Sequence, residues 1–594
     1  MMVEIRLPRF LIIKIFDYLY YSYGHEKGTI TTTRFGIGKL LSLLCREFRD
    51  ILARRYKIIN NISTKIDFEI LRNRGLDNFT DIVIFSNSVL REVQNSKEIY
   101  PFVTGVDLIG FENFDISNFT GPQSRLNHLA LHDTPIDSLN SVISQLLSIQ
   151  LKETENEVAV LPQLSKLEFG VRPKHSVLDI QSIANAFRNS PLTQFRCYSG
   201  VSWVNMESLM IFNQLNRLSI SNGYICANVL SAVVTKLRSL TEIDMYKVNF
   251  EQSKNHDLDK GLDIFLQDGI SKTETLLYWR LVGTEKLVSL NTLTSSLSSN
   301  KSIESIIIFN VFFTKTDGEN ITINNQIIRN FYSSSNSVMD DQKKNTNVKF
   351  NLGSLWFSPS NIKRLYIQGI KIDKNIEEYH NKLYYVNGIE TVELISLLQL
   401  SLPNLKKVST ISRYFYEPSE LYEKLLELLL KHPLTKLEFE GAYPKSLVIQ
   451  LIQSNHPNIK QLYIHNVQEV LPERDLFEAL LQNNTISKFR YFIHTSKKFT
   501  YNCEDWAKLI CQLVNLKNLH SLSITFPITL VDQKTISPEK LKELQQQVKQ
   551  ILIDNLDHLY HLYLSGQRRM VLRDLINKLF LEKNKHLKVF RGFV

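Results

Sequence analysis

Apolar residues recur along most of this chain in a short spaced pattern, apolar-x-x-apolar-x-apolar. The last two apolar positions alternate with a polar one, which is the period of a β-strand buried on one face. One copy is too short to bury its own apolar face, whereas many copies stacked side by side shelter one another, so the pattern predicts a repeat array. The clearest copies are Leu126, Leu129, Leu131; Leu215, Leu218, Ile220; Ile362, Leu365, Ile367; Leu434, Leu437, Phe439; Ile459, Leu462, Ile464; Leu519, Leu522, Ile524; and Leu559, Leu562, Leu564.

Segments with the 3.6-residue period of an amphipathic helix lie between these copies. Ser537, followed by Pro538 and Glu539, has the composition of a helix N-terminus. Successive copies begin at intervals such as 25 residues (Leu215 to Leu240) and 27 residues (Ile459 to Ile486). A helix in each interval provides the crossover that parallel neighbouring strands require. The expected helices cover residues 138–149, 179–187, 225–237, 421–430, 475–481 and 505–514.

This arrangement resembles the long, irregular leucine-rich repeats that often follow an F-box. The resemblance implies an α/β solenoid over residues 59–594, with a curved parallel sheet and helices on the convex face. One family feature is mostly missing, the Asn three residues after the last strand apolar residue. Asn87 has that place after Ile84, but Gly223, Ile370 and Val467 have it elsewhere. We therefore expect the turns to satisfy their backbone groups by other means.

The repeat spacing fails between the copies that begin at Ile303 and Ile362, which stand 59 residues apart. Residues 333–337 and 340–347 fill part of this interval with polar side chains that build no core. The sequence thus predicts a protruding polar loop at about 313–350. It leaves open whether the array is one continuous solenoid or two joined near residue 350.

Two amphipathic helices are predicted before the array. Leu7-Pro8 opens the first, because Pro is tolerated in the first turn of a helix. The second runs from about 39 to 56, and one of its sides is apolar. The apolar positions of the two helices include Leu11, Ile12, Ile15, Leu19, Leu44, Cys45 and Phe48.

These residues resemble the F-box pattern of Leu-Pro, spaced aliphatic residues and a later Leu-x-x-Val-Cys-Lys-x-Trp/Phe, which is matched here by Leu41, Leu44, Cys45, Arg46 and Phe48. The two halves stand roughly a dozen residues further apart than in a typical member, a length of loop that costs little closure entropy. The resemblance implies an all-α F-box-like module at 1–58 that docks on the linker protein of an SCF ubiquitin ligase. Its contacts would be Leu7, Pro8, Leu11, Ile12, Ile15, Leu19, Leu44, Cys45 and Phe48. The alternative is that these helices only cap the first repeat.

The composition argues against nucleic acid, zinc and membranes as partners. The formal net charge is +10, but 70 Lys and Arg are dispersed among 60 acidic residues without a dense basic stripe, so nucleic acid is not the expected partner. The five cysteines are odd in number and lack CxxC spacing, which fits reduced thiols in the cytoplasm or nucleus and no zinc site. No apolar run approaches the ~20 residues that cross a bilayer, so no membrane partner is expected.

Catalytic signatures are absent from the sequence, including phosphate-binding loops and the GxSxG and HExxH motifs. We therefore expect no enzyme, cofactor or metal. The resemblance implies an F-box-like adaptor that recruits a target protein for ubiquitination; the alternative is a leucine-rich-repeat interaction scaffold without that role. The target would contact polar positions between the strand apolar residues: His128, Ala130, Arg217, Ser219, Tyr366, Tyr463 and Ser523.

Overall fold

The computed structural model describes residues 58–62, 80–84 and 87–94, most of 100–366 and of 372–550, and the strands at 561–565 and 589–590. The chain divides into two compact units, Met1–Asn361 and Ile362–Val594, here called the N-terminal and C-terminal units. The expected F-box-like module, with contacts Leu7, Pro8, Leu11, Ile12, Ile15, Leu19, Leu44, Cys45 and Phe48, lies outside the described residues.

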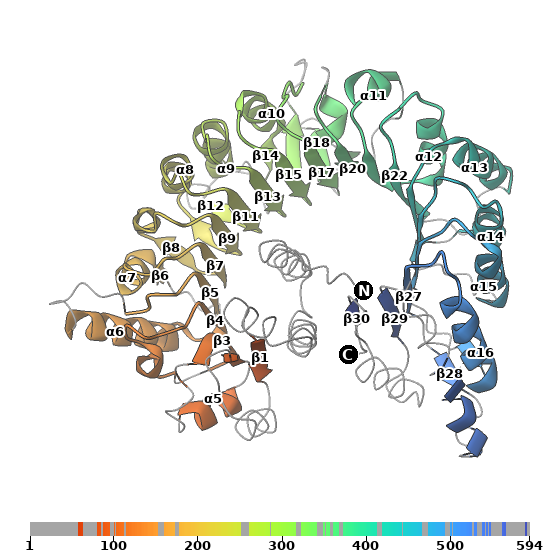
Figure 1. Ribbon diagram of the computed structural model, residues 1–594. Helices are drawn as coiled ribbons and strands as arrows, with labels where there is room; N and C mark the ends of the chain where they lie inside the picture. Colours follow the sequence, from red (N-terminus) through yellow and green to blue (C-terminus); the bar gives the residue numbers. More distant parts are fainter. Residues whose placement is uncertain are drawn as a thin grey trace, which may run out of the picture. The chain divides into compact units, whose positions relative to one another are not determined.

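The N-terminal unit contains a parallel sheet in which successive repeats pair in sequence order (Figure 1). Its register aligns the same motif position in each repeat, so that Leu129 pairs with Leu167, and Phe195 with Leu218. The strands are β1 (Ile58–Ile62), β2 (Thr80–Ile84), β3 (Val103–Ile109), β4 (His128–Thr134), β5 (Lys166–Val171), β7 (Gln194–Ser199), β9 (Arg217–Ser221), β11 (Glu242–Tyr246), β13 (Tyr278–Val282), β15 (Ser305–Phe309) and β17 (Asn330–Ser334).

The C-terminal unit repeats this construction. Leu437 pairs with Leu462, and Leu462 with Phe489, again at one motif position. Its parallel strands are β20 (Arg364–Tyr366), β21 (Tyr385–Ile389), β22 (Lys407–Ser412), β23 (Lys436–Gly441), β24 (Gln461–His465), β25 (Lys488–Phe492), β27 (Ser521–Thr525), β29 (His561–Ser565) and β30 (Val589–Phe590).

The apolar motif forms the core of each unit, as the sequence predicts. In the N-terminal unit, Leu215, Leu218 and Ile220 have no exposed surface, and in the C-terminal unit the same holds for Leu434 and Leu437. Fully burying one such side chain contributes ~1.5–3 kcal/mol of transfer free energy. The array is therefore held together by contacts between neighbouring repeats, which is the defining property of a repeat fold.

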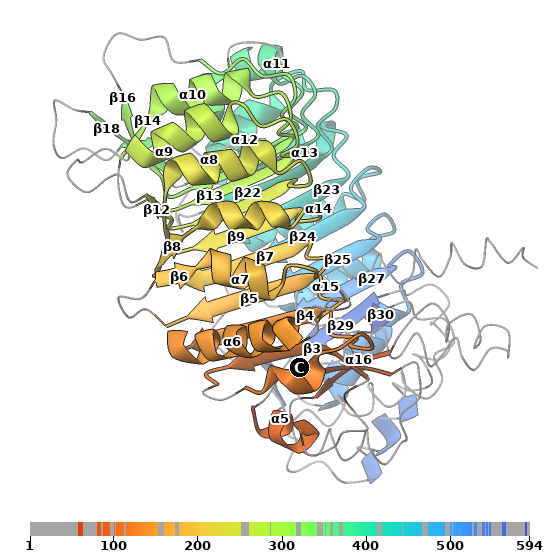
Figure 2. The ribbon, with the colours of Figure 1, turned by 90° about the vertical axis from the view of Figure 1, so that its left-hand side faces the viewer.

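Among the described residues, helices cover one face of each sheet, and the other face is formed by the strands (Figure 2 shows the helices of the N-terminal unit on their face). Asp179 begins one helix by accepting the backbone N–H groups of Gln181 and Ser182. The expected helices are confirmed as α6 (Ile136–Lys152), α7 (Ile180–Ala186), α8 (Ala227–Lys236), α13 (Ser419–Lys431), α15 (Glu473–Gln482) and α16 (Cys503–Val514). Further helices are α5 (Asn87–Gln94), α9 (Lys260–Ile264), α10 (Leu290–Ser299), α11 (Lys374–Tyr379), α12 (Thr391–Leu398) and α14 (Lys445–Gln453).

Short secondary strands follow many of the main strands, a feature that the apolar pattern does not predict. In the N-terminal unit they form a parallel ladder of β6 (Val177–Asp179), β8 (Ser202–Val204), β10 (Tyr224–Ile225) and β12 (Asn249–Phe250). In the C-terminal unit β26 (Phe499–Tyr501) pairs with β28 (Ile528–Leu530). These ladders tie neighbouring repeats together at a second place.

The segment expected as a polar loop at about 313–350 is corrected by the structure, which places strands there. The described part of this segment includes β17 of the main sheet and the strands β16 (Phe312–Lys315), β18 (Asn336–Asp340) and β19 (Val348–Phe350), which form a second ladder together with β14 (Val288–Ser289). Residues 316–321 and 341–347 lie outside the described residues. Its polar residues are compatible with burial because they are paired. The buried Asn336 amide donates to Ser333 Oγ and to the Ile308 carbonyl, and its oxygen accepts the Val311 N–H.

The turns satisfy their backbone groups on the helix-to-strand side of each repeat. The amide of Asn483 donates to the Ile452 carbonyl and accepts the N–H groups of Thr485 and Ile486. His456 replaces an Asn in this role, because its ring contacts the Leu430 carbonyl and accepts two backbone N–H groups. Asn300 and Asn325 form the same arrangement. These side chains precede the strands, so they bond a different turn from the one after the strand at which the family Asn is mostly missing.

Candidate functional site

The candidate site is the face of each sheet opposite the described helices. Every main strand places its alternate residues there, for example His128, Ala130 and His132 on β4, and the register aligns them with the same positions on neighbouring strands. The residue before each strand, such as Asn127, forms the rim. We call these positions together the strand face.

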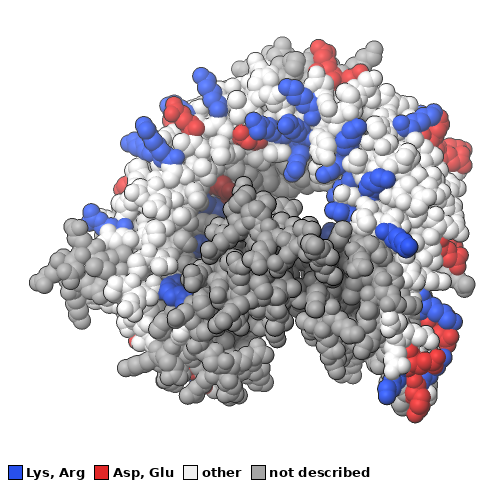
Figure 3. Space-filling model, in the orientation of Figure 1, with Lys and Arg blue, Asp and Glu red and all other residues white. Residues whose placement is uncertain are grey.

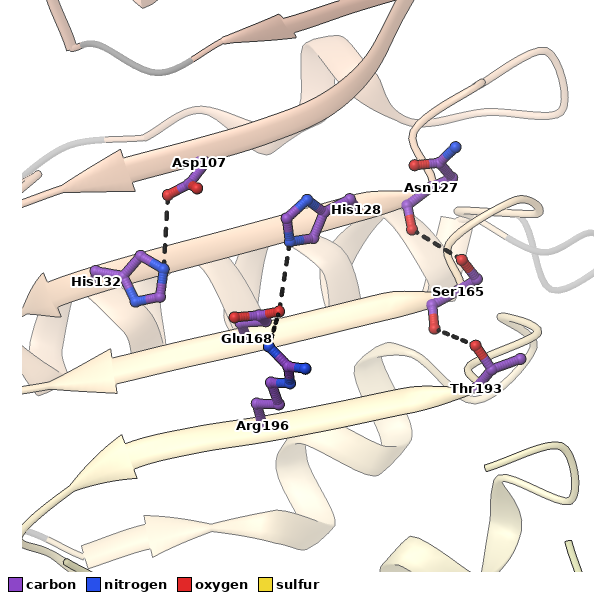
Figure 4. A network of polar contacts seen from close by, with 8 residues as sticks. All are labelled: Asp107, Asn127, His128, His132, Ser165, Glu168, Thr193 and Arg196. Carbon is purple, nitrogen blue, oxygen red and sulfur yellow. Dashed lines mark hydrogen bonds and ion pairs between the residues drawn. The ribbon is translucent and has the colours of Figure 1, made fainter. Parts of the chain in front are cut away.

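A polar network links four strands of the N-terminal face (Figure 4). Glu168 on β5 lies 3.2 Å from Arg196 of β7 and 3.8 Å from His128 of β4. Asp107 on β3 lies 3.5 Å from His132 of β4. These side chains come from repeats that are adjacent in space, so the network exists only when the repeats stack in register.

Burial sets the protonation of this network. Burial raises the pKa of Asp107 above its usual range, although the nearby His132 and His128 oppose the rise. Burial also lowers the pKa of His128, even though Glu168 and Asp107 favour its charged form. His128 is therefore neutral near pH 7, and Arg196 is the cation that compensates Glu168.

The same pairing continues along the N-terminal face. Arg280 lies 3.1 Å from Asp244, Arg217 lies 3.4 Å from Glu242, and Arg329 lies 3.5 Å from Glu304. Across β3–β17, the rim and face positions carry five basic and five acidic side chains, so the face is formally neutral. The basic residues are Lys166, Arg196, Arg217, Arg280 and Arg329, and the acidic ones are Asp107, Glu168, Glu242, Asp244 and Glu304.

Hydroxyl groups fix the rim of the face. Ser165 Oγ donates to the Asn127 carbonyl at 3.2 Å, and Thr193 Oγ1 donates to the Ser165 carbonyl at 3.0 Å (Figure 4). In the C-terminal unit, Thr435 and Ser487 bond in the same way to the carbonyls of Lys406 and Lys460. The rim is thus a hydrogen-bonded ladder that holds each repeat to the one before it.

The C-terminal face combines cations with tyrosine rings. Lys436 Nζ lies 4.4 Å from the ring centroid of Tyr463 and 5.8 Å from that of Tyr385. Lys436 also bonds Glu438 at 2.8 Å, and Glu438 lies 3.3 Å from His465. Burial, with help from Glu438, raises the pKa of Tyr385 to about 12. Burial lowers the pKa of His465 although Glu438 favours its charged form, and the nearby Arg490 adds to the lowering.

The residues predicted to contact a target all lie on the strand faces, but they differ in accessibility. His128, Arg217 and Tyr463 are partly exposed; His128 and Arg217 each lie beside a carboxylate, and Tyr463 lies beside the Lys436 ammonium group. Ala130, Ser219, Tyr366 and Ser523 are buried. Ala130 and Ser219 are short side chains between longer ones, since Ala130 is flanked by Asp107 and Glu168. The side chains that extend furthest from the face are therefore the longer ones, which include His128, Arg217 and Tyr463 among the predicted residues.

The part of the chain that the structure describes gives little support for metal binding, thiol chemistry or membrane insertion. Within those residues, no cluster of three His, Cys, Asp or Glu side chains is arranged to hold a metal ion. Among the described cysteines, Cys197, Cys226 and Cys511 are not in disulfide bonds, and burial raises the pKa of Cys511. None of the described helices is both long enough and apolar enough to span a bilayer.

Comparisons with known proteins give distant structural similarity and no family. No protein-family model matches the chain, and no curated protein matches its sequence. The leucine-rich-repeat ectodomain of a plant membrane receptor kinase from Arabidopsis thaliana is similar at 11% identity and a TM-score of 0.27, covering 82% of this chain and 58% of that one. An internalin from Listeria monocytogenes is similar at 10% identity and a TM-score of 0.24, covering 77% of this chain and 95% of that one.

A mouse RP105/MD-1 complex is similar at 10% identity and a TM-score of 0.28, with 74% of this chain and 79% of that chain covered. The chain thus spans little more than half the length of the plant ectodomain. At such scores the argument for the fold comes from the chain itself. Its strand, turn and helix repeat, with parallel pairing in sequence order, is a leucine-rich-repeat-like fold.

Proposed function

We propose that this chain is a leucine-rich-repeat scaffold that binds a protein partner through its strand faces and catalyses no reaction itself. The observation that carries the proposal is the row of Arg–carboxylate pairs across β5–β13, which holds long side chains in fixed positions. Side chains ordered before binding lose less entropy when a partner docks. Arg and Tyr are also the residues most enriched among the contacts that dominate binding energy.

The N-terminal face offers such residues at accessible positions. Tyr198 and Tyr246 are exposed at the third face position of β7 and β11. Arg280 is partly exposed and is oriented by Asp244. Aromatic rings beside oriented guanidinium groups can bury apolar area and donate hydrogen bonds at the same place.

A double substitution tests this function. Affinity purification of the full chain from its native cell extract should recover partners that are lost in Tyr198→Ala/Arg280→Ala. Removing two such contacts weakens binding by about tenfold or more. Glu423→Ala/Lys424→Ala, at exposed positions of α13, is the matched control and should retain them. Equal recovery with all three proteins would contradict a role for this face.

We further propose that the partner is a ubiquitination target and that residues 1–58 dock on the SCF linker protein. The support is the sequence resemblance at Leu7-Pro8 and at Leu44 to Phe48. Helix-in-groove docking through apolar anchors is the expected mode of contact. Purified linker protein should bind the full chain and should fail to bind Leu7→Ala/Pro8→Ala/Leu44→Ala. Unchanged binding by that variant, or no binding by the parent chain, would leave the helices as a cap of the first repeat.

A further inference from the structure

Charge is distributed unevenly on the C-terminal strand face. Across β20–β25, the rim and face positions carry eight basic and two acidic side chains, a formal net charge of +6. The basic residues are Lys363, Arg364, Lys406, Lys407, Lys436, Lys460, Lys488 and Arg490, and the acidic ones are Glu438 and Glu440. Figure 3 shows Lys and Arg side chains gathered over these strands. We call this surface the basic face.

Most of these cations have no carboxylate partner in the part of the unit that the structure describes. Lys363, Arg364, Lys460, Lys488 and Arg490 are exposed to solvent. Among the described residues, none of these five forms an ion pair with a carboxylate. Like charges so close together repel one another, and an anionic partner would remove that repulsion.

The spacing of the cations suits an extended chain of acidic residues. Lys407 pairs in register with Lys436, while Lys436 and Lys488 stand two strands apart. Neighbouring strands lie about 4.7–4.9 Å apart, so these ammonium groups recur every ~5–10 Å across the sheet. Side chains on one side of an extended peptide recur every ~6.6 Å, which a flexible Lys can match.

The tyrosines favour a polypeptide over a single-stranded nucleic acid. Nucleic-acid grooves of this kind use open aromatic faces on which bases stack. Here Lys436 and Arg490 lie over the ring of Tyr463, at 4.4 Å and 5.0 Å, and Lys407 lies 5.1 Å from the ring centroid of Tyr384. The rings therefore already stack with cations, which positions the cations and occupies the aromatic surface.

We propose that the basic face of the C-terminal unit binds an acidic polypeptide segment, rich in Asp and Glu, laid across β20–β25. The inference refines the proposed protein-binding function, since it states which chemistry one of the two faces recognises. Recognition arises from charge complementarity with exposed Lys and Arg, while Glu438 and Glu440 restrict where the partner's carboxylates can lie.

A labelled peptide provides the test. A fluorescein-labelled 20-residue Glu/Ser peptide should bind the full-length protein, and the same peptide with Gln for Glu should bind about tenfold or more weakly. Binding should fall as salt increases, because the pairs are exposed. Lys460→Glu/Lys488→Glu should weaken binding of the Glu peptide at least about tenfold. Lys301→Glu/Lys424→Glu, which makes the same charge change at exposed positions outside the basic face, should stay within about twofold.

The outcomes separate the alternatives. Equal loss in the two variants, or equal binding of the Glu and Gln peptides, would overturn the inference, as would tighter binding of oligouridylate than of the Glu peptide. Lys460→Gln/Lys488→Gln, with an intermediate loss and an unchanged melting temperature, would exclude unfolding as the cause. If the peptide fails while partner capture still depends on Tyr198 and Arg280, this inference falls and the proposed scaffold function stands.

Discussion

The two strand faces have the same backbone construction but differ in charge, because the N-terminal face is formally neutral and the C-terminal face is basic. In the N-terminal unit each face Arg has a carboxylate on its own or a neighbouring strand, as Arg196 has Glu168 and Arg280 has Asp244. In the C-terminal unit the basic residues outnumber the acidic ones and lie over tyrosine rings, as Lys436 and Arg490 do over Tyr463. The repeat needs only its inward apolar residues to stack, so the outward ones are free to differ.

This comparison distinguishes two kinds of binding surface. The N-terminal face is ordered before a partner arrives, and its pairs must be broken or extended by that partner. The C-terminal face has charge that is not balanced locally, so a partner of opposite charge gains attraction at long range. Specificity is therefore expected to depend on geometry in one unit and on charge in the other.

The largest expected effects come from the core that both faces share. Leu218→Ala and Leu437→Ala each remove a fully buried side chain and should each cost about 2–5 kcal/mol of unfolding free energy. Because each residue belongs to a different compact unit, each variant should speed hydrogen exchange mainly in its own unit. Similar acceleration in both units, measured by mass spectrometry, would mean that they unfold together.

The next largest loss of stability is expected from breaking the side-chain hydrogen bonds of the helix-to-strand turns. Asn483→Ala leaves the Thr485 and Ile486 N–H groups and the Ile452 carbonyl without their side-chain partner. Unpaired buried groups cost about 1–3 kcal/mol each, partly offset by relaxation, so a total loss of about 2–3 kcal/mol is expected by urea unfolding. A loss below about 0.5 kcal/mol would show that the backbone closes the turn alone.

Acid should weaken the C-terminal unit through His456. Burial lowers the pKa of His456, while its bond to the Leu430 carbonyl opposes the change. Its Nδ1 accepts two backbone N–H groups, so protonation breaks those bonds. The contribution is complete above the ordinary pKa near 6.5 and is lost as the pH falls through that value toward the folded pKa.

Melting temperatures between pH 7.5 and pH 5 check this dependence. His456→Asn should keep the turn, because Asn fills the same role at Asn483, and should lose part of the acid sensitivity. His465, whose pKa burial also lowers, is expected to supply the remainder. An identical pH profile for the parent chain and the Asn variant would contradict the assignment.

The smallest expected changes in stability come from single charge substitutions on the two strand faces, and they should differ in sign between the faces. Arg196→Gln removes a paired charge from the N-terminal face and should cost about 0.2–1 kcal/mol. Lys460→Gln removes a cation from the basic face and should be neutral or slightly stabilising, because it relieves repulsion. Urea unfolding at low salt should resolve the difference in sign. Equal costs for both substitutions would argue that the two faces are electrostatically alike.

Much of the fold could be predicted from the sequence, because the inward residues repeat. Leu129 and Leu131, for instance, show the two-residue period directly. The ladder of short strands could not, since a two-residue strand such as Tyr224–Ile225 has no period to detect. The strands at 313–350 could not be predicted, because a run of polar residues indicates a solvated loop, whereas Ser333 and Asn336 are buried and hydrogen-bonded to each other.

Part of the arrangement of side chains on the strand faces could be predicted from the sequence. Polar strand positions follow from the alternation, but pairs such as Glu168 with Arg196 depend on the register between repeats 28 residues apart. The sequence carries another signal at the second residue after the last apolar residue of the motif, where the backbone turns. Its backbone is left-handed at Gly110, Asp133, Asn222, Lys247, Gly283, Asn310 and Gly441, mostly residue types that tolerate this conformation.

One measurement tests most directly the claim that the two faces differ in what they bind. Hydrogen exchange of the full-length protein should be followed with and without a saturating Glu/Ser peptide. Slower exchange is expected in residues 384–412 and 434–492, with no change in residues 127–171 and 194–246. Protection confined to the N-terminal unit, or equal in both units, would contradict the account.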